Sequence, residues 1–117
     1  MLTITVPGLP TSLNAWSREH WRTRNAERAE WADRMAEYLL VAGCRKRKPK
    51  FKGNVEVSLL YRIADKRKHD LDNLVPKHAL DAMIGWVYDD DSQIVRLIQS
   101  KESAKFNETV ITVREVE

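Results

Sequence analysis

The stretch from residue 55 to residue 63 constrains the fold more than any other part of the chain. Every second residue in it is apolar, from Val55 to Ile63, and Glu56, Ser58 and Arg62 lie between them. This period of two is that of a β-strand with one buried face. An isolated strand is not stable in water, so residues 55–63 must pair with other strands in a sheet that is covered on one face.

Other segments supply the partners of this strand. Residues 2–6, 94–100 and 109–116 have the apolar content and the turn-forming borders of strands. Residues 23–42 carry apolar side chains at helical spacing, and residues 74–84 predict a second helix with Asn73 or Asp72 as its N-cap and Pro76 in its first turn. The order β-α-β-α-β-β predicts one α+β domain over residues 1–117, a small mixed sheet with both helices on one face.

The composition excludes several classes of protein. With 43% apolar and 32% charged residues, the chain is not expected to be disordered. No apolar run approaches the ~20 residues of a membrane span, and no signal peptide is expected. A single cysteine, Cys44, allows neither an internal disulfide nor a zinc finger, which is typical of the reducing cytoplasm. The four glycines form no phosphate-binding loop, so no nucleotide cofactor is expected.

Positive charge is concentrated between residues 45 and 68. This stretch has only two acids, Glu56 and Asp65, and it holds ten of the 20 basic residues: Arg45, Lys46, Arg47, Lys48, Lys50, Lys52, Arg62, Lys66, Arg67 and Lys68. Such a field favours polyanions, and DNA or RNA phosphate is the usual partner. For residues 45–52 alone, a solvated and disordered linker is an equally good interpretation.

Two groups of aspartates are candidates for metal binding. Asp70 and Asp72 are two apart in a segment expected to be extended, so their side chains point to the same side. The run 89–91 consists of three aspartates that repel one another unless a cation is present, and it lies just before the predicted strand at 94–100. Mg²⁺ takes oxygen ligands of this kind together with phosphate and water. Alone, each group is also explained by helix caps and an acidic turn.

The predicted helix between the two acidic groups is short enough to bring them to neighbouring places on the sheet. Lys77, in its first turn, could face the same site and stabilise charge that develops on a phosphate. The alternative is a surface ion pair between Lys77 and Asp81. His69, beside Asp70, could contact phosphate or act as a base.

Aromatic and basic residues also alternate near the N-terminus. Trp16 and Trp21 lie among Arg18, Arg22 and Arg24. This pattern can stack on unpaired bases or hold a nucleic-acid backbone. Tryptophan is equally often a core residue or an anchor in a dimer interface, so both interpretations stay open.

Several of these residues together resemble the RusA family of Holliday-junction resolvases. The stretch Asp70-Leu71-Asp72-Asn73-Leu74, then Lys77, Leu80-Asp81-Ala82 and Asp90-Asp91-Ser92-Gln93-Ile94, is similar to the family's pattern. The segment Leu9-Pro10-Thr11-Ser12-Leu13-Asn14 resembles the family's motif after the first strand. The spacing from Asp72 to Lys77 is one residue longer than in the family.

The resemblance implies a homodimeric, Mg²⁺-dependent endonuclease, with Mn²⁺ able to substitute, that cuts four-way DNA junctions by paired nicks in a bacterial or phage-infected cell. It implies that Asp70, Asp72 and Asp91 are metal ligands, with Asp90 as the alternative to Asp91, and that Lys77 is functional. The expected DNA contacts are Lys66, Arg67, Lys68, His69, Arg47, Lys48 and Asn14.

A dimer is also expected on physical grounds, because a four-way junction is cut in two strands related by a near two-fold axis. Two alternatives remain at this point. One is a nuclease for flaps or other branched DNA, and the other is a non-catalytic nucleic-acid-binding domain.

Overall fold

The computed structural model describes residues 1–18, 20–65 and 69–117. Its elements follow the order β1 (Leu2–Pro7), α1 (Leu13–Arg18), α2 (Trp21–Val41), β2 (Val55–Ile63), α3 (Lys77–Ala82), β3 (Ile94–Ser103) and β4 (Glu108–Glu115). Two 3₁₀ turns, η1 (Leu71–Asn73) and η2 (Asp91–Gln93), precede α3 and β3. The predicted α+β class is confirmed.

The four strands form one mixed sheet in the order β1-β4-β2-β3. Strand β4 pairs antiparallel with both β1 and β2, whereas β3 pairs parallel with β2. The strand at residues 55–63 is therefore an inner strand, and β3 is an edge strand. Because β2 and β3 run in parallel, Asp91 lies at the end of the pair where β2 begins, and the chain leaves β2 at the opposite end.

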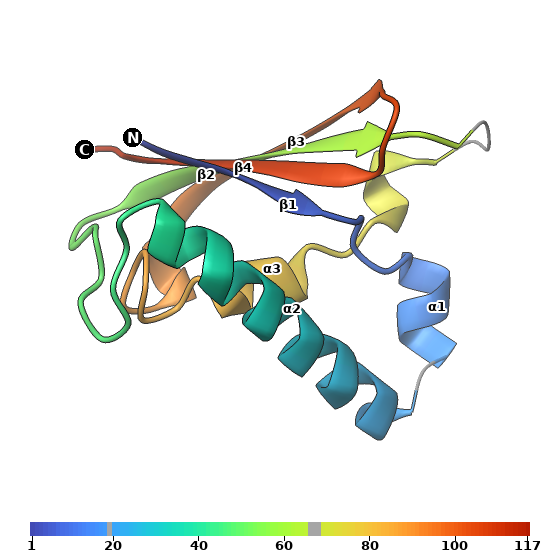
Figure 1. The fold of residues 1–117 in the computed structure, drawn as a ribbon, viewed down its shortest axis with the longest axis horizontal. Coiled ribbons are helices and arrows are strands. Elements are labelled where there is room, and N and C mark those ends of the chain that lie inside the picture. Colours follow the sequence, from blue (N-terminus) through green and yellow to red (C-terminus); the bar gives the residue numbers. More distant parts are fainter. Residues whose placement is uncertain (19, 66–68) are drawn as a thin grey trace.

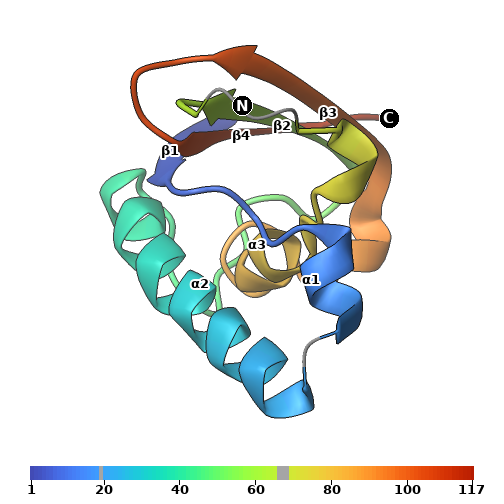
Figure 2. The same cartoon turned by 90° about the vertical axis from the view of Figure 1, so that its right-hand side faces the viewer.

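All three helices lie on one side of the sheet, as the views in Figures 1 and 2 show. Helix α2 buries Trp31, Met35 and Leu39 against the sheet and α3. Full burial of a side chain such as Met35 or Leu39 stabilises the fold by about 1.5–3 kcal/mol. Within the described part of the chain, none of the helices combines the length and the apolar surface needed to cross a bilayer.

The second predicted helix is much shorter than expected. Residues 74–84 were assigned to it, but α3 spans only Lys77–Ala82, with Pro76 at its N-cap position and no side-chain cap from Asp72 or Asn73. Leu74 instead forms a bridge with Ser12, and the Val75 amide donates to the Thr11 carbonyl at 2.9 Å. Pro76 also disfavours a helical conformation at the residue before it.

Helix α1 was not predicted at all. It has six residues and none of them is buried, so it carries no apolar stripe that a periodicity argument could detect. The predicted helix at 23–42 and the strands at 2–6, 55–63, 94–100 and 109–116 are found with boundaries shifted by at most three residues.

Candidate active site

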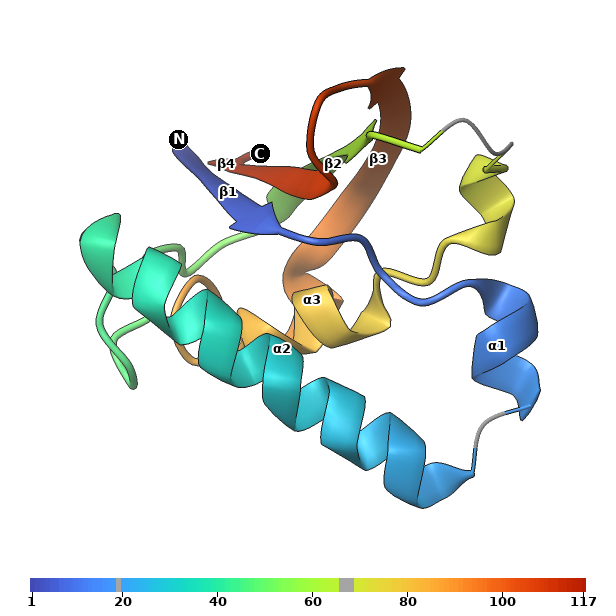
Figure 3. The ribbon, with the colours of Figure 1, turned by 45° about the vertical axis from the view of Figure 1, so that its right-hand side comes forward.

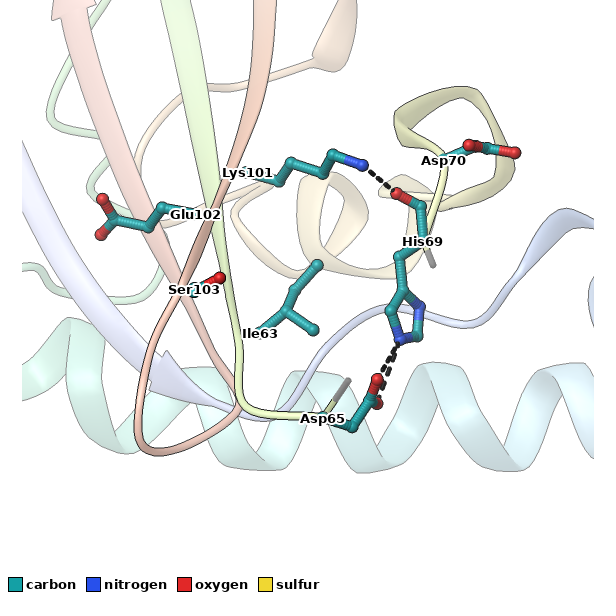
Figure 4. Close-up of a pocket in the computed structure, with 7 residues that line it drawn as sticks. All are labelled: Ile63, Asp65, His69, Asp70, Lys101, Glu102 and Ser103. Atoms are coloured by element: carbon teal, nitrogen blue, oxygen red, sulfur yellow. Dashed lines mark hydrogen bonds and ion pairs between the residues drawn. The ribbon is translucent and has the colours of Figure 1, made fainter. Parts of the chain in front are cut away.

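A pocket of about 490 Å³ lies between the ends of β2 and β3, and it is lined by Ile63, Asp65, His69, Asp70, Lys101, Glu102 and Ser103. Both Asp65 carboxylate oxygens lie within hydrogen-bond distance of His69 Nε2, at 2.8 and 3.0 Å. Lys101, on β3, donates to the His69 backbone carbonyl and so ties this segment to the sheet edge. Figure 4 shows the Asp70 carboxylate pointing away from Lys101 and the His69 ring. Lys66, Arg67 and Lys68, predicted DNA contacts, lie outside the described residues.

The prediction that Asp70 and Asp72 share one side of an extended segment is wrong. Asp70 is extended (φ −85°, ψ 135°) and caps η1, but Asp72 lies within that 3₁₀ turn, where side chains do not alternate with a period of two. Both carboxylates are exposed. The turn packs against α1, which carries Asn14, and against β3. The structure therefore brings the two segments of the sequence pattern, 9–14 and 70–74, side by side.

The second acidic group is organised by a glutamine. The Asp90 carboxylate accepts a hydrogen bond from the Ser92 amide, and the Gln93 side chain accepts one from the Asp90 amide, which completes a capping box. Hydrogen bonds from Ser92 hold the pKa of Asp90 below its usual value. Because Asp90 caps the turn, Asp91 is the better candidate for a metal ligand.

Gln93 also joins this turn to the preceding loop. Its Oε1 accepts hydrogen bonds from the Asp89 amide at 2.7 Å and the Asp90 amide at 3.2 Å. Its Nε2 donates to the carbonyls of Phe51 at 3.1 Å and Gly53 at 2.8 Å. Every strong hydrogen-bonding position of the amide is used. Gln93 was not among the predicted site residues, although the spacing Asp-x-x-Gln is itself a capping-box signal.

Lys77 forms the ion pair with Asp81 that was the alternative to a role in the site. Its Nζ lies 3.4 Å from Asp81 Oδ2, and Arg28 from α2 approaches the same carboxylate at 4.0 Å. Tyr88 donates its hydroxyl hydrogen to the Leu80 carbonyl. Burial, followed by the charges of Asp91 and Asp81, raises the pKa of Tyr88.

His78, the next residue, is buried at 3% exposure between α1, α2 and α3. Its ring lies 4.8 Å from the Trp16 ring, and its Nε2 is 3.7 Å from Glu27 Oε2. Neither ring nitrogen has a hydrogen-bond partner among the described residues. Burial lowers the pKa of His78, and the carboxylate of Glu27 only partly opposes this shift. His78 is therefore a neutral packing residue near neutral pH.

The basic residues from 45 to 52 form an ordered loop, so the interpretation as a disordered linker is wrong. Backbone amides of Arg47, Lys50 and Phe51 donate to the carbonyls of residues 85, 86 and 87 at 2.9, 3.2 and 2.9 Å. These bonds place the loop beside the segment that leads into Asp89–Asp91. The side chains of this basic loop are exposed: Arg45, Lys46, Arg47, Lys48, Lys50 and Lys52.

Arg47 has an unusual backbone conformation within this loop. Its φ is +67°, and it is the only non-glycine residue with positive φ in the described parts of the chain. This conformation costs a residue with a Cβ roughly 1–2 kcal/mol. Strained residues of this kind concentrate at functional sites. The strain is consistent with the predicted role of Arg47 in DNA binding.

The candidate metal ligands do not form one closed group. Within residues 1–18, 20–65 and 69–117, no three His, Cys, Asp or Glu side chains are close enough to hold an ion. Asp91 lies just before β3 begins at Ile94. His69, in contrast, is hydrogen-bonded to Lys101, which lies near the other end of β3. The joint role of Asp70, Asp72 and Asp91 as ligands therefore stays a prediction. Their exposed carboxylates fit Mg²⁺ chemically, because this ion takes one or two carboxylates and completes its shell with water and phosphate.

The fold and its side chains place the protein among small α+β domains that combine exposed carboxylates with an ordered basic loop. A sequence model described as Endodeoxyribonuclease RusA matches residues 7–114 of the 117-residue chain. The chain belongs to the RusA family and is an endodeoxyribonuclease. No curated protein matched it.

Family membership confirms the resemblance drawn from the sequence and implies a role as a Holliday-junction endonuclease that binds branched DNA. It also sets aside the interpretation as a non-catalytic DNA-binding domain.

Proposed function

We propose that this chain cuts four-way DNA junctions by paired, Mg²⁺-dependent phosphodiester hydrolysis, as a homodimer acting in recombination and repair. The observation that carries the proposal is the position of the basic loop. Its backbone bonds to residues 85–87 place a dense positive surface directly beside Asp89–Asp91. Phosphate would then be captured beside Asp91, one of the three proposed metal ligands.

Asp70, Asp72 and Asp91 would hold the metal, with Asp90 fixing the turn that presents Asp91. A bound ion would supply an activated water and neutralise charge on the scissile phosphate. The basic loop binds the DNA backbone on either side of that phosphate, through side chains such as Arg47 and Lys48. Lys77 is held by Asp81 at 3.4 Å in the free protein and exchanges this partner for a phosphate oxygen when DNA binds.

Electrostatic contacts to phosphate dominate such an interface, so we expect affinity for a junction to fall steeply with salt concentration. The two cuts require two active sites related by a two-fold axis, which one protomer does not supply. Sedimentation of the protein at micromolar concentration tests the dimer directly, and a monomer under conditions that support cleavage would contradict it.

The decisive experiment compares labelled four-way junctions, flaps and linear duplex, each incubated with Mg²⁺, Mn²⁺ or a chelator. We expect paired nicks in the junction, with both ions and not with the chelator. The variants Asp70→Asn, Asp72→Asn and Asp91→Asn should lose cleavage and keep junction binding. Asp33→Asn, which neutralises an exposed acid on α2, is the matched control and should cut normally.

Three outcomes would contradict the proposal. Cleavage of flaps without cleavage of junctions would show that the substrate is another form of branched DNA and not the four-way junction. Full activity in the presence of the chelator would show that cleavage does not require a metal ion. Undiminished cutting by Asp91→Asn would overturn the assignment of the ligands.

A further inference from the structure

We propose that the corner between α1 and α2 is a second DNA contact, in which the ring of Trp21 stacks on an unpaired base beside the branch point. The inference rests on the proposed function, since branched DNA supplies such bases where its arms meet. We call this region the aromatic corner and define it by the residues that carry the argument: Arg18, His20, Trp21, Arg22 and Arg24.

The Trp21 side chain is largely exposed and is not part of the hydrophobic core. Its exposed fraction is 60%, whereas Trp31 on the same helix is buried at 6%. Leaving an aromatic ring of this size in water forfeits the free energy that its burial would provide. Trp21 contributes nothing to the core, so its ring is available to a partner.

The ring is held in place although it is exposed. The guanidinium carbon of Arg22 lies 5.3 Å from its centroid, and the centroid of the His20 ring is 5.4 Å away. His20 is itself fixed as the N-cap of α2, because its Nδ1 accepts a hydrogen bond from the Arg22 amide. A ring fixed in this way loses little conformational entropy when a ligand stacks on it.

The aromatic corner is fastened to the candidate active site. Arg24 donates from Nε to the Trp16 carbonyl at 3.0 Å, and its guanidinium carbon lies 4.8 Å from the centre of the Trp16 ring. The Trp16 ring also contacts His78, which follows Lys77 at the start of α3. Helix α1 also packs against η1, the turn that contains Asp72. Figure 3 shows α1 between η1 and the first turns of α2.

The charge around Trp21 favours a nucleic acid over a protein partner. Residues 16–26 contain three arginines and one acid, Glu19. Arg18 and Arg22 are exposed and can hold the phosphates that flank a stacked base. Base stacking on an aromatic ring tolerates any sequence, which suits an enzyme that recognises branched structure. A second copy of this chain would instead have to bring like charges together.

The test uses the full-length protein and a four-way junction that carries 2-aminopurine at the branch nucleotide, with Ca²⁺ in place of Mg²⁺ to limit cleavage. Stacking on one aromatic ring is worth about 1–3 kcal/mol, so we expect Trp21→Ala to weaken junction binding by about 5- to 150-fold. Linear duplex should bind within about two-fold of wild type. The wild-type protein should quench 2-aminopurine, and Trp21→Ala should not.

Two further variants make the result specific. Trp21→Phe keeps a stacking surface and should restore most of the affinity and the quenching. Phe106→Ala removes another exposed aromatic ring, in the loop between β3 and β4, and should change neither. Arg18→Ala removes an exposed positive charge and should weaken binding of junction and duplex alike and reduce the dependence of affinity on salt.

Several results would overturn the inference. If Trp21→Ala lowered the affinity for junction and for duplex equally, the aromatic corner would be a contact to the DNA backbone and not a stacking site for an unpaired base. Dissociation of a dimer by Trp21→Ala would make it an interface between copies. A protein that binds junctions but cuts no branched DNA would contradict the proposed function, while the 2-aminopurine signal would still decide whether Trp21 stacks.

Discussion

Replacing Gln93 by leucine should loosen the turn that presents Asp91. The substitution keeps the approximate volume and removes four hydrogen bonds, two accepted by Oε1 and two donated by Nε2. A hydrogen bond contributes about 0.5–1.5 kcal/mol net. Three of the four are exposed and water can replace them, so the part-buried bond to the Phe51 carbonyl contributes most. We expect a loss of about 2 kcal/mol in the free energy of unfolding.

The assay has two readouts. Urea unfolding followed by tryptophan fluorescence should show the lost stability, which corresponds to a fall in the melting temperature of roughly 8 °C for a chain of this size. Cleavage of a four-way junction well below that temperature should fall at least tenfold, because small displacements of a catalytic group are costly. The Mg²⁺ concentration needed for half-maximal cleavage should rise, since Asp91 would be less well positioned.

Gln99→Leu is the matched control. It makes the same substitution on β3 and removes one hydrogen bond, the one that Gln99 Oε1 accepts from the Tyr61 hydroxyl. We expect a loss of about 1 kcal/mol and an unchanged Mg²⁺ requirement. The reasoning about Gln93 is refuted if Gln93→Leu is no less stable than Gln99→Leu, or if its dependence on Mg²⁺ equals that of the wild type.

Three other predictions concern the fold and the basic loop. Met35→Ala, at a fully buried position of α2, should cost about 2–5 kcal/mol in urea unfolding, and a loss below 1 kcal/mol would show that the core is not packed as described. Because the pKa of His78 lies below its unfolded value of 6.5, the unfolded state binds more protons, and stability should decline as the pH falls below about 6.5. His78→Leu should flatten that part of the pH profile, and an unaltered profile would argue against a buried neutral imidazole. Arg47→Gly relieves the positive φ at a small cost in unfolded-state entropy, so stability should stay equal or rise by up to about 1 kcal/mol while affinity for DNA falls; a clear loss of stability would contradict the strain argument.

Sequence patterns predicted the elements whose stability comes from their own apolar face. Strand β2 and helix α2 carry such faces, and both are found close to the expected positions. Helix α1 buries none of its residues, so its sequence contains no apolar pattern. The start of α3 is decided by the pairing of Leu74 with Ser12, a contact across about half of the chain that local propensity does not encode.

The candidate site was predicted in composition and only partly in geometry. Asp70, Asp72 and Asp91 were identified from their charge and their positions at the ends of elements. The order β4-β2-β3, which sets Asp91 and the exit of β2 at opposite ends of a parallel pair, depends on long-range pairing. The capping role of Gln93 could have been predicted from the sequence, because its spacing from Asp90 is a local signal.

The backbone bonds that order the basic loop have a consequence for the kinetics of DNA binding. A disordered arm would have to fold during each encounter, and that step would lower the association rate or make it depend on the probability of folding. Here the amides of Arg47, Lys50 and Phe51 are already paired before DNA arrives. The association rate constant should therefore be set by diffusion and electrostatic attraction alone, and differences in affinity between junction and duplex should reside mainly in how fast each dissociates.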